Sequence, residues 1–484
     1  MSLSIPFDNS YAQELVGLYV PWQGQEWPDP QPLIVNTALA RDLGLAAEDL
    51  QGPEGVGLLT GHALPEAARP LAQAYAGHQF GGFSPQLGDG RAILVGELVD
   101  PAGLRWDLHL KGSGRTPFAR GGDGRAVLGP VLREYLVSEA MAAMGIPTTR
   151  ALAACGTGDK VLRQFGLEPG AVLARVASSH LRVGTFQFFA ARGEIDKLRL
   201  LTDYAIARHD PDLTGTEGAV LKFLGRVGER QARLVAQWMG IGFVHGVMNT
   251  DNTTISGETI DYGPCAFLET YDPAAVYSSI DQRGRYAYGN QPAIMLWNLA
   301  RLAEAVLPLI SADEDRAVAQ ASEVIGQTQT VYRHAWEDVF ARKLGLIEPD
   351  AALIDDMHRL WEGQDVDFTQ FFRELPKALD GEDAAVLALF RAPSGVEDWL
   401  TRYRATVSDR DAAKAQMRAV NPVYIPRNHL VEDALSAARD NNDLQPFRDL
   451  LARVQAPFDP LEGMDHFARP APRDAPAVVT YCGT

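Results

Sequence analysis

The sequence predicts an α+β protein in which the sheet-forming segments come first and helices dominate the second part. Polar and apolar residues alternate over residues 105–112, RWDLHLKG, as they do in a strand whose two faces differ. From about residue 290 onward, apolar residues instead recur at helical spacing, as in PAIMLWNLARLAEAVLPLI. The change from one period to the other predicts a sheet-rich region followed by a helical one.

Residues 92–111 are expected to form a β-hairpin. The apolar run AILVGELV is followed by DPAG at 100–103, where Pro second and Gly fourth suit a type I turn. The second strand then places Asp107, His109 and Lys111 on its polar face. This hairpin would present a lysine at the end of a strand.

The remaining elements before residue 290 follow from the same patterns. Residues 129–145 and 229–246 have apolar residues at helical spacing, and 171–176 is a short apolar strand candidate. The segment TTISGETIDYG, 253–263, is expected to be a short hairpin that ends in Asp261. A strand-rich first part with one early helix therefore leads into a helical second part.

Composition limits the classes of function. The 484 residues include 44 basic and 62 acidic side chains, a net charge of −18, which argues against general nucleic-acid binding because that depends on neutralising phosphates. The chain has no run of about 18 apolar residues and no basic-then-apolar leader, so neither a membrane span nor a secretory signal is expected. We expect a cytoplasmic protein that acts as a monomer.

The stretch HGVMNTDN resembles the catalytic loop of protein kinases with its key residue replaced. In the kinase pattern H-R-D-x-x-x-x-N, the Asp accepts the substrate proton and the Asn binds a metal. His245 and Asn252 have the kinase spacing, but Val247 stands where the Asp would be. Because a valine cannot accept a proton, the loop belongs either to an inactive protein or to an enzyme with different chemistry.

Five parts of a kinase-like nucleotide site occur in the kinase order. The Gly-rich backbone of 77–90 can approach phosphates closely, and a strand lysine and a helix carboxylate can form the ion pair that contacts them. An amide and a carboxylate offer oxygen ligands suited to Mg²⁺ or Mn²⁺. Spacing alone does not choose between two candidate glutamates. The side chains are Lys111, Glu134 or Glu139, Asn252, and Asp261 in DYG.

Arginines are locally dense in this acidic chain. Four of them surround the Gly-rich segment and the strand lysine. Arg175 lies at the end of the strand candidate at 171–176, and Arg182 follows seven residues later. A local excess of guanidinium groups suits a polyphosphate ligand. Scattered surface ion pairs are the alternative. The six residues are Arg91, Arg115, Arg120, Arg125, Arg175 and Arg182.

Four long motifs resemble the SelO (selenoprotein O, YdiU) family of protein adenylyltransferases. They are YAGHQFGGFSPQLGDGRA, DLHLKGSGRTPFARGGDGRAVL, HGVMNTDN and TIDYGPCAFLE, and the similarity extends to the late NPVYIPRN. The resemblance implies a protein-kinase-like bilobal fold with a β-rich N-lobe, a helical C-lobe, and N- and C-terminal extensions. The implied units are an N-terminal extension, 1–75; the N-lobe, 76–180; the C-lobe, 181–320; and a helical C-terminal region with a Cys-bearing tail, 321–484.

The resemblance also implies an activity. Members of this family transfer AMP from ATP to Ser, Thr or Tyr hydroxyls of proteins, with the nucleotide inverted so that its α-phosphate faces the acceptor. Mg²⁺ or Mn²⁺ is implied as cofactor, and transfer of UMP from UTP is implied for bacterial members. A phosphoryl-transferring kinase and a catalytically inactive ATP-binding scaffold are the alternatives.

The resemblance assigns roles to individual residues. Nucleotide contacts fall on Gly88, Gly90, Arg91, Lys111, Asp123, Gly124, Arg175, Arg182 and Asp261, with Glu134 positioning the lysine. The metal ligands fall on Asn252 and Asp261, and the proton acceptor falls on Asp251.

The family also carries a cysteine or selenocysteine near its C-terminus, and Cys482 takes that place here. Cys265 lies four residues after Asp261, in the segment equivalent to an activation loop. We expect a reversible disulfide between the two, since cytosolic disulfides are usually regulatory. Two unrelated thiols are the alternative.

Overall fold

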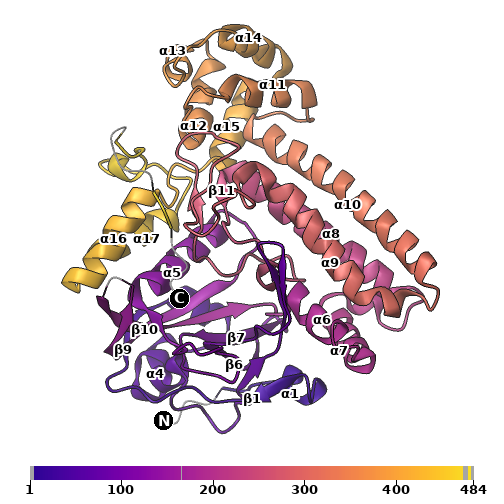
Figure 1. Cartoon of the computed structure of the whole chain (residues 1–484). Helices are drawn as coiled ribbons and strands as arrows, with labels where there is room; N and C mark the ends of the chain where they lie inside the picture. Colours follow the sequence, from indigo (N-terminus) through magenta and orange to yellow (C-terminus); the bar gives the residue numbers. More distant parts are fainter. Residues whose placement is uncertain (1–4, 165, 473–477, 481–484) are drawn as a thin grey trace.

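The computed structural model describes residues 5–164, 166–472 and 478–480 (Figure 1). Its main sheet is antiparallel, with strand order β1-β3-β6-β7-β10-β9-β2 and with β8 beside β10. Because this sheet precedes an almost wholly helical region, the predicted α+β class is confirmed. The strands are β1 Tyr19–Pro21, β2 Gln31–Val35, β3 Leu71–Gln73, β6 Ala92–Val99, β7 Arg105–Lys111, β8 Ala126–Val127, β9 Arg150–Arg163 and β10 Gly166–Ala177.

The predicted hairpin at 92–111 is confirmed as β6 and β7, in register with Ala92 opposite Lys111. Gly103 has φ +82° in the connecting turn, a conformation that favours glycine. The polar face of β7 is not solvent-facing, however, because Asp107 and His109 are almost completely buried. The side chain of Arg208, on α7 (Ile195–His209), donates to Asp107 at 2.7 Å and helps to cover this face.

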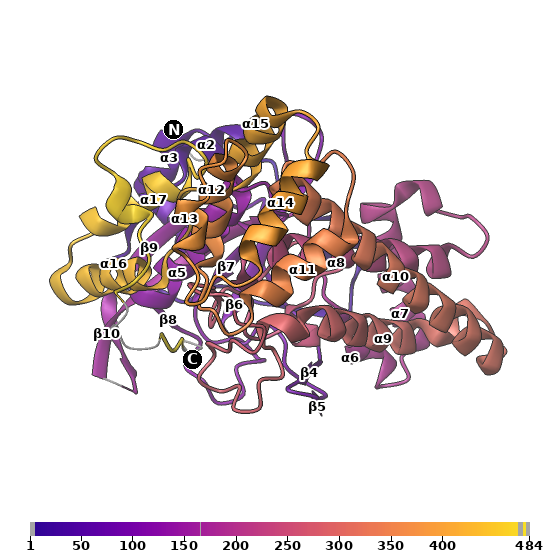
Figure 2. The ribbon, with the colours of Figure 1, turned by 90° about the horizontal axis from the view of Figure 1, so that it is seen from above.

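Helices cover both faces of the sheet. One face packs on α2 (Thr37–Asp42), α3 (Ala47–Gln51) and α4 (Pro53–Thr60). The other packs on the predicted helix, α5 (Leu128–Ala143). Two late helices, α16 (Asn428–Asn441) and α17 (Gln445–Val454), pack against α5, as the view from above shows (Figure 2). The position of α5 is therefore fixed from two sides.

Two sequence-based expectations near the site were wrong. The helix predicted at 229–246 is α8, which begins at Ala219 and ends at Ile241, because Gly242 adopts φ +69° and stops it. The short β11 (Phe243–Val244) follows and pairs with β12 (Ala266–Phe267). The chain thus turns back sharply just before the HGVMNTDN loop.

The hairpin predicted at 253–263 does not form. Thr254 makes its bridge with Arg182, and Thr259 makes its bridge with Thr148. The backbone hydrogen bonds of this segment therefore go to distant parts of the chain instead of across a local turn. Residues 253–263 connect the loop at 245–252 to the region around α5 and β9.

The second half of the chain is helical, as predicted. Its centre is formed by α8, α9 (Gln291–Ile310) and α10 (Glu314–Lys343), which pack side by side (Figure 1). By length and composition alone, residues 288–310 could cross a membrane, but α9 packs among α6, α8 and α10, as core helices do. The other elements are α1 Ser10–Glu14, α6 Val183–Ala190, α11 Ala351–Trp361, α12 Phe368–Ala378, α13 Ala384–Leu387, α14 Val396–Thr406, α15 Arg410–Val420, β4 Gly77–Gln79 and β5 Gly82–Ser84.

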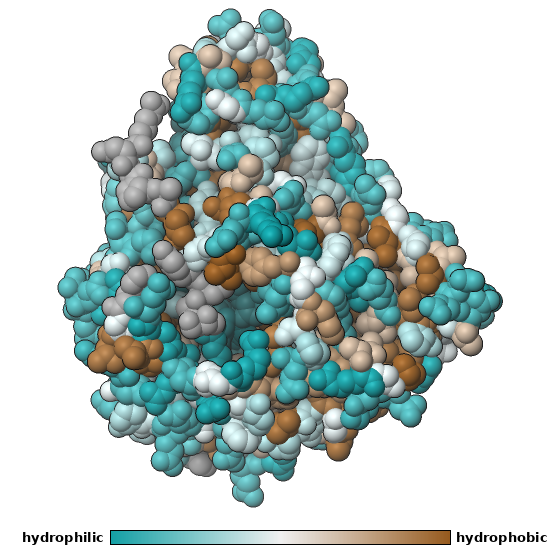
Figure 3. Space-filling model, in the orientation of Figure 1, coloured by the Kyte–Doolittle hydropathy of each residue, from teal (hydrophilic) through white to brown (hydrophobic). Residues whose placement is uncertain are grey.

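A recess lies between the sheet-bearing and helical regions. The space-filling view shows it near the centre of the molecule, with a hydrophilic floor (Figure 3). Five of the segments that line a cavity between these regions are the C-terminal end of β7, α5, β10 and the loops at 247–252 and 261–264.

Candidate active site

The cavity between the two regions has a volume of about 360 Å³, within the range of small-ligand sites. Elements far apart in sequence supply its walls, and most of the predicted site residues meet there. The predicted residues that line it are Gly90, Arg91, Lys111, Glu134, Arg175, Asp251, Asn252 and Asp261.

Two cations and two carboxylates form a closed cluster in the cavity wall. Lys111 Nζ lies 2.6 Å from Glu134 Oε2 and 2.6 Å from Asp261 Oδ1. Arg175 Nη1 lies 2.8 Å from the same two carboxylates. Each charge therefore has two partners of opposite sign, which is what a buried ionic group requires.

The structure resolves the choice between the two glutamates of α5. Glu134 holds Lys111, whereas Glu139 accepts hydrogen bonds from Arg150 and from Asn36 at 2.8 and 2.7 Å. The five-residue separation puts the two side chains on different sides of the helix. Glu139 therefore ties α5 to β9 and has no part in the cluster.

Asp261 is held as a carboxylate. Burial alone would raise its pKa, but the positive charges of Lys111, Arg175 and Arg182 hold the pKa well below its ordinary value. Asp261 has φ +63°, a left-handed conformation that costs a residue with a side chain about 1 kcal/mol. Its two ion pairs compensate for this strain and fix the direction of the carboxylate.

Arg182 is a buried guanidinium with free donors. It is 1% exposed, its Nη1 lies 3.7 Å from Asp89 Oδ1, and its guanidinium stacks 4.3 Å from the centre of the Tyr75 ring. Its Nε and Nη2 have no hydrogen-bond partner in the part of the chain that the structure describes. Since unpaired buried donors are costly, this arrangement favours an anionic ligand.

Asp251 lines the cavity and has one carboxylate oxygen without a partner among the described residues. Its Oδ2 accepts a hydrogen bond from Gln79 Nε2 at 3.0 Å, and Oδ1 has no partner among the described residues. Burial raises the pKa of Asp251 to about 6, against the opposing effects of Gln79 and Arg182. A carboxylate with a pKa near neutrality is suited to accept a proton from a substrate hydroxyl.

Gly77 leaves the space that Asp251 occupies. A methyl group there would overlap with Asp251 Oδ1 and lie 2.8 Å from Leu87 Cδ1. We therefore expect Gly77→Ala to displace the carboxylate and to lower the transfer rate about 100-fold, the effect typical of a misplacement of about 1 Å. Initial-rate measurements at saturating nucleotide check this expectation.

The matched control is Gly82→Ala in the paired strand of the same β4–β5 hairpin, where the nearest atom would lie at 3.6 Å. This variant should keep the parental rate. Equal rates for Gly77→Ala and the parent protein would show that the position of Asp251 is unimportant.

The loop at 245–252 is held by neutral hydrogen bonds. His245 Nε2 donates to the Ile260 carbonyl at 2.9 Å, and its Nδ1 accepts from the Val247 backbone N–H at 3.3 Å. Burial lowers the pKa of His245, which keeps the ring neutral. His245 thus joins this loop to the residue that precedes Asp261, while Val247 presents an apolar side chain to the cavity.

The donors fit a hard divalent cation in part. Asn252 Nδ2 donates to the Val247 carbonyl at 3.0 Å, which leaves Oδ1 as the end of the amide that can bind a metal. Asp261 Oδ2 accepts no hydrogen bond from the described residues. No group of three or more His, Cys, Asp or Glu side chains over the described ranges is placed to hold a metal. A Mg²⁺ with two protein oxygens takes its other ligands from phosphates and water.

Several predicted residues, including the buried Arg182, are absent from the residues that line the cavity. Gly88 packs on the Phe118 ring, and Gly124 packs on the Arg115 backbone. Asp123 pairs with Arg163 at 2.7 Å. The nucleotide roles of Gly88, Asp123 and Gly124 therefore stay predictions.

The arginine cluster expected around Lys111 forms only in part. Arg91 and Arg120 line the cavity, but Arg125 pairs with Asp159 at 2.7 Å and stacks on Trp27. Arg115 lines a different hollow. These two arginines diverge because the loop at 112–125 folds back on itself through the Gly114–Gly124 hydrogen bond.

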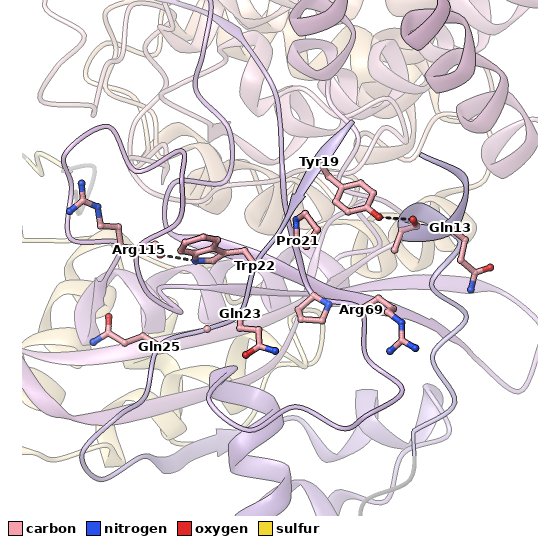
Figure 4. Close-up of a pocket in the computed structure, with 11 residues that line it drawn as sticks. Gln13, Tyr19, Pro21, Trp22, Gln23, Gln25, Arg69 and Arg115 are labelled. Atoms are coloured by element: carbon pink, nitrogen blue, oxygen red, sulfur yellow. Dashed lines mark hydrogen bonds between the residues drawn. The ribbon is translucent and has the colours of Figure 1, made fainter. Parts of the chain in front are cut away.

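The second hollow, of about 840 Å³, is larger than the cavity but has few side chains that could transfer a proton or bind a metal. Trp22 lies across it and donates to the Arg115 carbonyl at 2.8 Å, while the Arg115 guanidinium points away from the indole (Figure 4). Among the residues that the structure describes, its lining includes no carboxylate, histidine or cysteine. The groups suited to proton and phosphate chemistry therefore lie in the smaller cavity.

Two of the three cysteines lie within the described ranges. Both Cys155 and Cys265 are buried, and burial raises the pKa of each thiol to about 12. The predicted partner of Cys265, Cys482, lies outside the described residues. Thr480 is described, and its Oγ1 donates to the carbonyl of Pro264 at 2.8 Å.

Four residues of the site were missed from the sequence. Gln79 contacts Asp251, Tyr75 stacks on Arg182, and Asp89 and His109 lie between the arginines. Of these four, only His109 could be linked to the site from the sequence, because the alternating pattern of β7 places it on the same face as Lys111. The others depend on contacts between segments that no local pattern reveals.

Comparison with known proteins agrees with this geometry. Residues 2–455 match the family model described as protein adenylyltransferase SelO. The chain is 56% identical to a protein nucleotidyltransferase YdiU of Cereibacter sphaeroides strain KD131, with all of both chains covered. It is 54% identical to the protein of that name from Mycolicibacterium paratuberculosis and 52% identical to the one from Pseudarthrobacter chlorophenolicus, with 99% of each chain covered. The chain therefore belongs to the SelO family of protein adenylyltransferases and is a nucleotidyltransferase.

Proposed function

We propose that this enzyme transfers AMP from ATP to Ser, Thr or Tyr hydroxyls of target proteins and releases pyrophosphate. The observation that carries the proposal is the buried guanidinium of Arg182, which keeps two unpaired donors. Its positive charge also opposes part of the rise that burial causes in the pKa of nearby Asp251. A nucleotide whose β- and γ-phosphates reach Arg182, Arg175 and Lys111 presents its α-phosphate toward Asp251. This is the inverse of the kinase orientation.

The residues of the cavity suit the steps of such a transfer. Asp251 Oδ1 takes the proton of the acceptor hydroxyl as its oxygen bonds to the α-phosphorus. The bond from the α-phosphorus to the bridging oxygen breaks, and the electron pair leaves with pyrophosphate. Negative charge therefore grows on the leaving side, where Lys111, Arg175 and Arg182 supply fixed positive charge.

We propose Asn252 Oδ1 and Asp261 Oδ2 as the protein ligands of a Mg²⁺ or Mn²⁺ ion. A bound divalent cation would neutralise phosphate charge and orient the nucleotide. Asp261 would then have two roles, since its other oxygen already holds Lys111 and Arg175. The phosphate contacts do not depend on the base, so we also propose UTP as a second nucleotide substrate.

The position of the label in radioactive ATP separates this proposal from its alternatives. With ATP labelled at the α-phosphate, we expect stable labelling of acceptor protein, and with the γ-label none. Labelling from the γ-position would identify a phosphoryl-transferring kinase. No labelling from either position, with Mg²⁺ or Mn²⁺ and under reducing or oxidising conditions, would identify an inactive ATP-binding scaffold.

We further propose the arrangement that the family resemblance implies. The N-terminal extension is 1–75, the β-rich N-lobe is 76–180, the helical C-lobe is 181–320, and the C-terminal region is 321–484 of a kinase-like bilobal fold. The cavity at the junction of sheet and helices supports this division. We propose a cytoplasmic monomer whose partners are acceptor proteins and neither nucleic acid nor membrane.

We propose that Cys265 and Cys482 form a reversible disulfide. The contact of Thr480 with Pro264 supports it, because these residues lie two and one positions from the two cysteines. With an oxidised low-molecular-weight disulfide as oxidant, non-reducing peptide mapping should find the two peptides linked. Cys155, which packs in a different core cluster from Cys265, should stay free as an internal control. Recovery of Cys265 and Cys482 as free thiols would contradict the pairing.

A further inference from the structure

A buried histidine joins the two arginines that we assign to the phosphates. Arg175 Nε donates to His109 Nδ1 at 3.3 Å, and His109 Nε2 lies 3.2 Å from Asp89 Oδ2. Asp89 Oδ1 in turn faces Arg182 Nη1 at 3.7 Å. The order Arg175–His109–Asp89–Arg182 is therefore a continuous chain of polar contacts beneath the cavity.

The donor at one end fixes the tautomer of the ring. Because a guanidinium Nε–H can only donate, His109 Nδ1 must be unprotonated, and the ring proton lies on Nε2 and points to Asp89. Burial, Arg175 and Arg182 all lower the pKa of His109 well below its ordinary value, so the ring stays neutral. A protonated ring would lose the contact with Arg175 and add a third positive charge.

The ring is also held on its faces. His109 is completely buried, and it stacks on His180 with ring centres 4.3 Å apart and planes 17° apart. His180 is fixed by Asp107, which accepts hydrogen bonds from its backbone N–H at 2.8 Å and its Nδ1 at 3.1 Å. The ring therefore has little freedom to move, and neither do its two hydrogen-bond partners.

We infer that His109 is a positioning residue that sets the spacing of Arg175 and Arg182 for a polyphosphate. Arg175 is held at Nε by His109 and at Nη1 by Glu134 and Asp261, and its Nη2 donates no hydrogen bond to the described residues. Arg182 likewise keeps two donors unpaired. The ring thus orients free donors on both arginines without touching the ligand. This inference rests on the proposed function, since it takes the polyphosphate as the ligand.

Three variants separate the two contacts of the ring. His109→Asn places an oxygen near the Nδ1 position and keeps the Arg175 contact alone. His109→Gln places an amide nitrogen near the Nε2 position and keeps the Asp89 contact alone. His109→Phe keeps an aromatic ring against His180 and loses both contacts.

The test is calorimetric binding of ATP and of adenosine to each full-length protein. Partners that orient ligating groups typically contribute 10–100-fold in affinity, so we expect His109→Phe to weaken ATP binding by about that factor. Adenosine binding should not change. His109→Asn and His109→Gln should each recover part of the ATP affinity, which a merely structural role would not predict.

The outcomes distinguish the two levels of inference. If the parent protein binds ATP no more tightly than adenosine, the polyphosphate assignment of the cavity is wrong. If the parent prefers ATP and His109→Phe keeps that preference, the positioning role of His109 is wrong. An equal loss of ATP and adenosine affinity in His109→Phe would also overturn it, because the defect would then be general.

Discussion

Asp251→Asn is expected to abolish nearly all transfer while making the folded protein more stable at neutral pH. A positioned general base typically contributes 10²–10⁴-fold to the rate, so we expect a fall of at least about 100-fold in the rate at saturating nucleotide. In the parent protein, this rate should rise through an apparent pKa of about 6. ATP binding should be retained, because in the proposed mechanism Asp251 acts on the acceptor hydroxyl and not on the nucleotide.

The stability of the same variant has a defined pH dependence. The pKa of Asp251 rises from an ordinary 3.8 to about 6 on folding, so the parent protein loses stability as the pH rises through that window. An asparagine does not ionise. Asp251→Asn should therefore be more stable above pH 6 by about 3 kcal/mol, and the gain should vanish below about pH 4. Thermal unfolding at both pH values measures the difference.

Either half of this result can fail alone. Full transfer by Asp251→Asn would remove Asp251 as the base. An equal stability gain at pH 4 and pH 8 would show that the ionised carboxylate is not the cause. Glu258→Gln is the comparison variant at a second buried carboxyl, because burial raises the pKa of Glu258 as well. Glu258 contacts Ser178 and Ser256 and is absent from the residues that line the cavity.

Arg182→Met is expected to lower kcat/KM for ATP by about 100- to 1000-fold, the loss typical of a single donor to a developing anion. Methionine has a similar length and fills the space over Tyr75 without the charge. Asp89 keeps its hydrogen bonds from the Gln73 backbone and from His109. Initial rates over a range of ATP concentrations measure the effect.

Arg182→Lys is the matched control for Arg182→Met. It keeps the positive charge but loses the planar fork of donors, so its activity should lie between those of Arg182→Met and the parent protein. Parental kcat/KM in Arg182→Met would contradict the assignment of Arg182 to the phosphates. Thermal unfolding without nucleotide checks that both variants fold.

The local pattern of polar and apolar residues was sufficient to predict much of the fold and part of the site. Alternation predicted β6 and β7, and helical spacing predicted α5, so Lys111 and its glutamate partner could be placed on facing elements. Spacing could not choose Glu134 over Glu139, because the choice depends on Arg150 and Asn36 as partners of Glu139.

The helix end at Gly242 has a local cause, but the error at 253–263 arises where distant segments decide the local structure. Residues 253–263 look like a hairpin, but their bridges go to Arg182 and Thr148. The alternating pattern of β7 likewise does not reveal that α7 helps to cover its polar face, where His109 becomes part of a buried chain of contacts. Tertiary contacts of this kind have no local signal in the sequence.

The most direct test of the inverted nucleotide is a crystal structure of the enzyme with Mg²⁺ and an ATP analogue that cannot be cleaved between its α- and β-phosphates. We expect the α-phosphate next to Asp251, and the β- and γ-phosphates at Lys111, Arg175 and Arg182. A γ-phosphate next to Asp251, with the adenosine deep in the cavity, would contradict this and point to a kinase.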